Sequence, residues 1–185
     1  MQRWRAARVY SAVLTFTALG GFLGLAMGLA GGLARRSASA GARAAIVGLL
    51  LGTSVAAPLS LALVSYFFKT HDPQSNDLVL PLLTHSALWS AVGAIAGLAF
   101  GLGLGGKGRW KATLVGGLVG AAAATIIYEI VGALAFASSK TDLPLSASIT
   151  SRGMAHLLVA ILSAAGAAWA LRQSPRRKAV SSALS

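Results

Sequence analysis

The residue of this chain with the clearest chemical potential is Glu129, the only carboxylate inside a long apolar stretch. The other three acidic residues lie in polar segments between the apolar ones. A charged carboxylate at the centre of a membrane span costs about 2–3 kcal/mol or more, so it normally faces protein or water. We therefore expect Glu129 to meet polar groups on a neighbouring helix, about 13 Å from the end of its own helix at 1.5 Å per residue.

Two histidines lie near the ends of other apolar stretches. His85 is followed four residues later by Trp89, and His156 is followed by Ala160. This spacing places each imidazole on a face that contacts another helix. If both histidines converge on Glu129, the three side chains form a proton-handling or metal site.

A plainer interpretation of these residues stays open. Single histidines near helix ends also form hydrogen bonds to neighbouring helices, with no further role. His71, Asp72 and Asp77 could supplement the site from an adjoining polar segment. Because no pair of ligands has the spacing of a known metal motif, we expect neither a metal site nor a cofactor.

Pro58 interrupts the second apolar stretch and removes one helical hydrogen bond, which predicts a kink. Kinked helices at mid-membrane line the substrate sites of many transporters, although membrane helices also tolerate proline without such a role. Pro58 therefore joins Glu129, His85 and His156 as a candidate for a polar or proton site.

Glycine recurs at every fourth residue in two of the apolar stretches. The ladders are Gly20, Gly24, Gly28, Gly32 and Gly93, Gly97, Gly101, Gly105. A residue without a side chain every four positions leaves a groove in which another helix packs backbone to backbone. Gly116 and Gly120 form a similar pair in a third stretch. Although residues 101–108 resemble a nucleotide-binding loop, such a loop requires a preceding strand, and these glycines end a helix.

The ladders also indicate an internal duplication. Residues 20–28 match 93–101 at an offset of 73, and residues 43–48 with Gly52 match 111–116 with Gly120 at an offset of 68. Each copy is a helical hairpin with a basic turn. Two helices separate the copies, which predicts a parallel repeat. Chance similarity between glycine- and alanine-rich helices is the alternative.

Composition decides the fold class. The chain is 56% hydrophobic and 11% charged, with a mean hydropathy of +0.73, whereas soluble domains carry about 25% charged residues. We predict an all-α, polytopic transmembrane bundle with spans at 9–34, 44–68, 82–105, 112–137 and 153–171. The hairpins then occupy 9–68 and 82–137, and the fifth helix is 153–171. Residues 1–8 are expected to form a basic interfacial N-terminus, and 172–185 a basic disordered tail. A cleavable signal peptide within 1–42 is the competing interpretation of the N-terminus.

The distribution of cations favours one orientation. Ten of the sixteen Lys and Arg residues fall on the side that faces the cytoplasm if the N-terminus is outside and the C-terminus inside. The arginines at positions 3, 5 and 8 oppose this orientation. The net charge of +12 is explained by topology and by contact with anionic lipid headgroups rather than nucleic acid. A bacterial inner (cytoplasmic) membrane is the expected location.

These features predict a non-catalytic integral membrane subunit that packs against partner subunits of a larger complex or associates with itself. The alternative is a small ion- or proton-coupled transporter or channel with Glu129 in its pathway. We expect no enzymatic activity, because the sequence has no cysteine and no nucleophile elbow or paired catalytic carboxylates.

Overall fold

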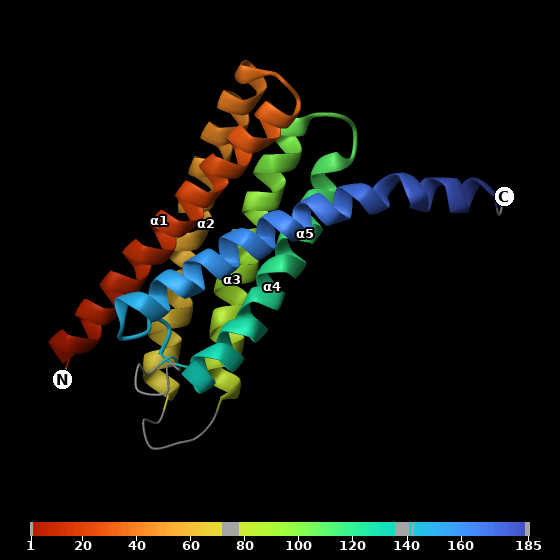
Figure 1. Cartoon of the computed structure of the whole chain (residues 1–185). Helices are drawn as coiled ribbons and strands as arrows, with labels where there is room; N and C mark the ends of the chain where they lie inside the picture. Colours follow the sequence, from red (N-terminus) through yellow and green to blue (C-terminus); the bar gives the residue numbers. More distant parts are fainter. Residues whose placement is uncertain (1, 72–77, 136–140, 142, 184–185) are drawn as a thin grey trace.

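The computed structural model describes residues 2–71, 78–135, 141 and 143–183, and the side chains of 4–71, 78–135, 141 and 143–173. These residues form five helices and no strand (Figure 1): α1 (Gln2–Ala34), α2 (Ala38–Thr70), α3 (Val79–Leu104), α4 (Arg109–Ala135) and α5 (Ile149–Ala183). Each helix contains an apolar segment long enough to cross a membrane. The prediction of an all-α bundle with five spans is therefore confirmed.

Two terminal segments continue the adjoining helices. Helix α1 runs without interruption from Gln2, and the place of residues 1–8 at the membrane interface stays a prediction. No glycine or proline precedes Gly20, so nothing breaks the helix there. At the other end, α5 continues as a helix to Ala183, beyond residue 171. The run Arg-Arg-Lys-Ala at 176–179 consists of strong helix formers but follows Pro175, which lacks a backbone N–H, and the expected disorder of 172–185 stays a prediction.

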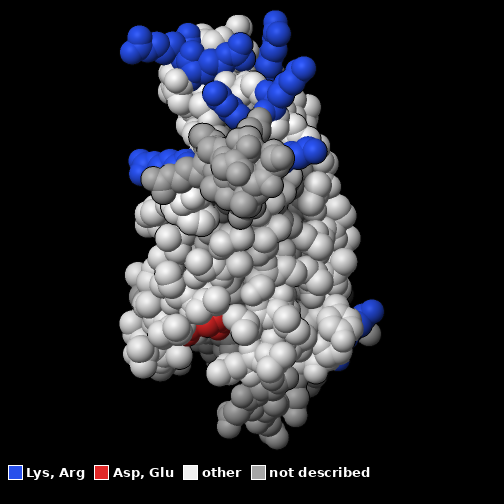
Figure 2. Space-filling model, turned by 90° about the vertical axis from the view of Figure 1, so that its right-hand side faces the viewer, with Lys and Arg blue, Asp and Glu red and all other residues white. Residues whose placement is uncertain are grey.

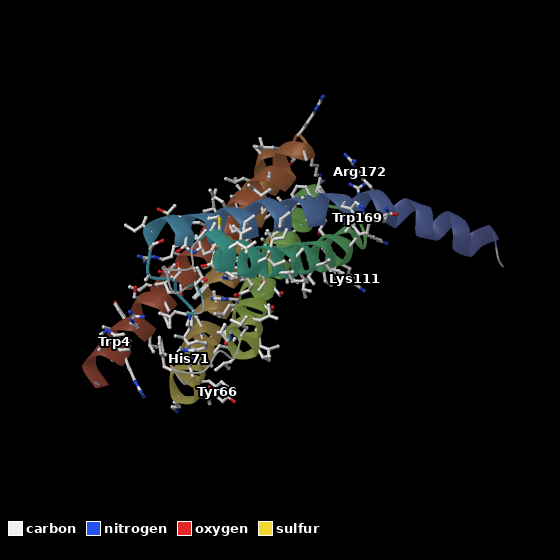
Figure 3. The ribbon with its side chains drawn as sticks, turned by 60° about the horizontal axis from the view of Figure 1, so that its bottom comes forward. Trp4, Tyr66, His71, Lys111, Trp169 and Arg172 are labelled. Atoms are coloured by element: carbon white, nitrogen blue, oxygen red, sulfur yellow. The ribbon has the colours of Figure 1, made fainter. Side chains whose placement is uncertain are left out.

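The bundle has two chemically distinct ends. Lys and Arg side chains gather at one of them (Figure 2), here called the basic end; its described cations include Arg35, Arg36, Lys107, Arg109 and Lys111. The opposite, histidine end contains His71, His85 and His156. Trp4, Tyr66 and His71 lie toward the histidine end, and Lys111, Trp169 and Arg172 toward the basic end (Figure 3). Tryptophan or tyrosine at both ends matches the two interfaces of a membrane.

Helix α3 lies at the centre of the bundle. It contacts each of the other four helices, whereas α2 packs on α1 and α3. Half of the α3 span is buried, compared with 22% for the spans of α2 and α5. Helix α5 crosses the second hairpin obliquely and then extends away from it (Figure 1). Helices α2 and α5 are thus the edges of the bundle.

Glycines hold the first hairpin together without intervening side chains. A methyl group added at Gly20 would lie 2.7 Å from the Gly52 carbonyl oxygen, well inside van der Waals contact. The remaining ladder positions of α1 meet α2 in the same way: Gly24 faces Gly48, Gly28 faces Ala44 and Ala45, and Gly32 faces Gly41. Helices α1 and α2 therefore touch through backbone atoms along most of their length.

The second hairpin uses the same device in a different register. A methyl group at Gly93 would lie 2.5 Å from the Gly117 carbonyl oxygen. Gly97 faces Thr113, and Gly101 faces Trp110. Gly117 thus occupies the place of Gly52, at an offset of 65 residues rather than the 68 of the sequence alignment. Because each residue turns a helix by about 100°, a shift of three residues points the aligned glycines of α4 away from α3.

The aligned glycines of α4 pack on α5 instead of α3. Gly116 faces Gly166, and Gly120 faces Leu162. The register changes because α3 ends at Leu104, before the last glycine of its ladder. Gly105 has a φ of 67° and Gly106 a φ of 89°, values that favour glycine and end a helix. Gly105 is therefore the cap of α3 rather than a rung between two helices.

Candidate functional site

The site is built around an ion pair or hydrogen bond between α3 and α4. His85 Nδ1 lies 2.6 Å from Glu129 Oε1. His85 is seven residues into α3, and Glu129 is six residues before the end of α4, so both lie about 9 Å from the histidine end of their helices at 1.5 Å per residue. Glu129 and His85, two of the candidates chosen from the sequence, are in direct contact.

The connection between α4 and α5 supplies the second partner of the imidazole. Leu143 is buried beneath the end of the bundle, and its carbonyl oxygen lies 3.2 Å from His85 Nε2. A carbonyl oxygen only accepts hydrogen bonds, so Nε2 carries a proton and donates it. The imidazole therefore joins three parts of the chain: its own helix, α4 and the connection that precedes α5.

These contacts define the proton content of the pair. With Nε2 protonated, one further proton lies between Nδ1 and the carboxylate oxygen. The pair is then either imidazolium with carboxylate or neutral imidazole with carboxylic acid, and its net charge is zero in both forms. Such a pair avoids the full penalty of an isolated charge in an apolar environment.

Two aromatic residues frame the imidazole. The Trp89 ring stacks on it, with ring centroids 5.0 Å apart and planes 21° apart. The Tyr128 ring meets it edge-on at 5.8 Å, and Tyr128 also contacts Trp89. Trp89 follows His85 by four residues, which places both on one face of α3. Together these rings hold the imidazole plane in one orientation toward Glu129.

Burial differs sharply across the pair. The exposed fraction is 2% for the His85 side chain and 20% for Glu129. Glu129 is the only acidic residue with a described side chain, and the red patch in Figure 2 lies in a hollow between residues other than Lys, Arg, Asp and Glu. The carboxylate is thus the accessible member of the pair, and the imidazole is the buried one.

The remaining sequence candidates take other positions. His156 lines a small hollow of about 10 Å³ together with His85, Trp89 and Tyr128, but it does not bond to the pair. Pro58 is exposed on α2, a helix that packs on α1 and α3. Asp72 and Asp77 lie outside the described residues.

Metal binding and proton conduction have different structural requirements. No group of three or more His, Cys, Asp or Glu residues converges in the described part of the chain. The buried hydroxyls of Thr84, Thr113 and Thr125 each bond to a carbonyl of their own helix. These hydroxyls therefore do not extend a polar chain from the pair toward the basic end.

Sequence patterns identified part of this site. The spacing of four residues from His85 already associated Trp89 with it. Tyr128 gave no separate signal, since it is adjacent to Glu129 in the sequence. The Leu143 carbonyl could not be anticipated from residue type, because every residue has one. No protein-family model, curated protein or solved structure matches the chain, so its function rests on the site and the fold.

Proposed function

We propose that this protein is a non-catalytic integral membrane subunit that packs against and stabilises partner subunits of a larger membrane complex. The supporting observation is the way in which the interior is closed. Backbone-to-backbone contacts at Gly24, Gly48, Gly97 and Gly117 fill the two hairpins, and the polar site is confined to the histidine end. A bundle of this kind offers structural surface rather than a solute path.

The edge helices are the surfaces that a partner would contact. Only 22% of the α2 and α5 spans is buried within the chain. The outer face of α2 exposes the large apolar side chains Leu50, Leu61 and Tyr66. These faces suit either lipid or the helices of another subunit, and the proposal assigns at least part of them to a partner or a second copy.

Orientation and internal symmetry are part of the same proposal. We assign the basic end to the cytoplasmic side of a bacterial inner membrane, with the N-terminus outside, because Lys and Arg favour the cytoplasmic side of a membrane protein. We also propose that the hairpins α1–α2 and α3–α4 are a parallel repeat to which α5 was added. Both ladders pack on the following helix, which supports the duplication, while the change of register in the second hairpin allows α4 to receive α5 as well.

Site-specific crosslinking in cells tests the subunit proposal. A photoreactive amino acid replaces Leu50 or Leu61 on α2. The same substitution at Ile126, an exposed residue of α4, serves as the control. Discrete crosslinked protein bands are expected from α2, followed by co-purification of the same partner after mild detergent extraction. A chain that crosslinks at none of these positions and purifies as a lone, functional monomer would contradict the proposal.

The His85–Glu129 pair favours a second candidate, an ion- or proton-coupled transporter or channel. Here a proton is held between His85 Nδ1 and Oε1 of the partly exposed Glu129 carboxylate. Carboxylates and histidines of this kind mark proton relays in membrane transporters. Flux of protons or cations into liposomes that contain the purified protein tests it, with Glu129→Gln as the variant and Ser54→Ala, on the exposed face of α2, as the control. Loss of flux in Glu129→Gln alone supports coupling; equal flux in all three proteins removes Glu129 from the pathway.

A further inference from the structure

A half-open hollow at the histidine end is separate from the His85–Glu129 pair. Its volume is about 180 Å³, and it lies between α1, α2 and the segment that leads into α5. Arg8 approaches from α1 and Arg152 from α5. The lining also includes the serines Ser11 and Ser146, while Phe68 contributes an apolar wall.

The two arginines have no acidic partner in the described part of the chain. The only pair of opposite charges found there is His85 with Glu129, and Glu129 does not line this hollow. Two guanidinium groups in a partly buried space repel each other and lose hydration. An anion between them would relieve both effects.

Existing contacts hold each guanidinium in place and leave donors free. The Arg8 guanidinium lies over the Trp4 ring, 4.2 Å from its centroid. Arg152 Nε donates to the Ser148 carbonyl oxygen at 3.4 Å, a contact that does not use the two terminal nitrogens. Arginine presents its N–H groups as a planar fork that matches the oxygens of phosphate or carboxylate.

A smaller hollow adjoins the inner side of this one and contains a further donor without an acceptor. Pro144, Leu145, Ser146 and Arg152 also line the smaller hollow next to His85. Trp89 lines that hollow as well; its side chain is 2% exposed, and its Nε1 has no hydrogen-bond partner. Since indole Nε1 can only donate, the unfilled need here is for an acceptor. That hollow has a volume of only about 10 Å³, so the ligand that we consider lies in the larger hollow, where Arg8 and Arg152 are the charged donors.

We propose that this hollow binds a phosphoryl oxyanion between Arg8 and Arg152. The phosphoryl group belongs either to a soluble phosphate compound or to the headgroup of an anionic phospholipid. The apolar wall at Phe68 suits the acyl chains of a lipid, whereas the serines Ser11 and Ser146 suit the oxygens of either ligand. This site is distinct from the proposed subunit function and does not depend on it.

Binding to the full-length protein in an uncharged detergent tests the proposal. Inorganic phosphate is titrated by calorimetry into the wild type and into Arg8→Gln, Arg152→Gln and Arg5→Gln. Arg5 is an exposed arginine on the same helix and is not part of the lining, so its variant controls for net charge. In a second arm, nanodiscs of phosphatidylcholine contain increasing phosphatidylglycerol, and native mass spectrometry measures the lipid that stays bound.

We expect at least tenfold weaker binding in both Arg8→Gln and Arg152→Gln and less than twofold change in Arg5→Gln. An effect on inorganic phosphate identifies a soluble ligand, and an effect confined to phosphatidylglycerol identifies a lipid headgroup. The proposal is overturned if neither probe binds, or if Arg5→Gln weakens binding as much as the other two. Should a glutamine variant lose its helical circular dichroism, Arg8→Lys and Arg152→Lys decide: several-fold weaker binding supports the arginine fork, and unchanged binding overturns it.

Discussion

Replacing Gly24 with alanine tests the backbone packing that closes the first hairpin. The added methyl group at Gly24 would overlap the backbone carbonyl group of Gly48. A backbone group inside a helix cannot rotate away as a side chain can. The two helices must separate locally, and the neighbouring contact of Gly20 with Gly52 would loosen with them. A methyl group added at Gly153, an exposed position of α5, would have no atom within 4 Å.

These two sites predict effects of opposite sign. Alanine in place of glycine favours a helix by about 1 kcal/mol, and this is the whole effect expected at Gly153. Overpacking a close contact costs about 1–3 kcal/mol, so Gly24→Ala should be destabilising by up to about 2 kcal/mol after the helix preference is subtracted. Gly132 is intermediate, because its added methyl would lie 3.1 Å from Thr141 Oγ1, a side-chain atom that can shift.

The assay is reversible unfolding of the purified protein in mixed micelles with increasing sodium dodecyl sulfate, followed by circular dichroism. The expected order of unfolding free energy is Gly153→Ala highest, then Gly132→Ala, then Gly24→Ala. If Gly24→Ala is as stable as Gly153→Ala, the helices of the first hairpin do not touch through their backbones in the membrane protein, and the packing argument fails.

Five further substitutions address the site, the start of α5 and the packing of the second hairpin in the same assay. Glu129→Gln retains a hydrogen-bonding partner for His85 and should cost less than Glu129→Ala, which leaves Nδ1 unpaired at a cost of about 1–3 kcal/mol; equal stability of the two variants would show that the hydrogen bond contributes nothing net. Ser148→Ala removes the side chain that accepts from the Ser151 N–H at 3.0 Å at the start of α5, for a loss of about 1 kcal/mol. Ser54→Ala, on the exposed face of α2, should change the unfolding free energy by less than about 0.5 kcal/mol. If it lowers stability as much as Ser148→Ala does, the loss at Ser148 is not due to capping. Gly97→Leu should prevent close contact with Thr113, and a variant with wild-type stability would show that this face is open.

The features most accessible to sequence reasoning were those that follow from periodicity. Apolar length predicted the five spans, and glycine spacing identified the faces of α1 and α3 that meet their neighbours. His85 and Glu129 were selected because polar residues in a span need partners, and the structure brings these two together. The spacing of four residues also selected His156, and the expected kink selected Pro58, but neither pattern states which neighbour a helix face meets.

The parts that escaped prediction depend on rotation and on irregular backbone. The register of the second hairpin follows from the end of α3 at Gly105, where positive φ stops the helix. Sequence alignment of the two hairpins could not reveal this, because the matching glycines of α4 remain glycines but face α5. Likewise, the Leu143 carbonyl reaches His85 through the fold of a connecting segment, which has no signature in residue type.

The contact of Gly24 with Gly48 has a consequence for how this protein can change over evolutionary time. In an ordinary core, a larger residue at one position is accommodated when a neighbour becomes smaller. Here neither helix has a side chain that could shrink, so no second substitution on the facing helix restores the space. Each such position must keep glycine on its own account, and sequence drift is left to the outward faces of the bundle. Paired substitutions should therefore be absent from these contacts in any set of descendants that keeps the same hairpin.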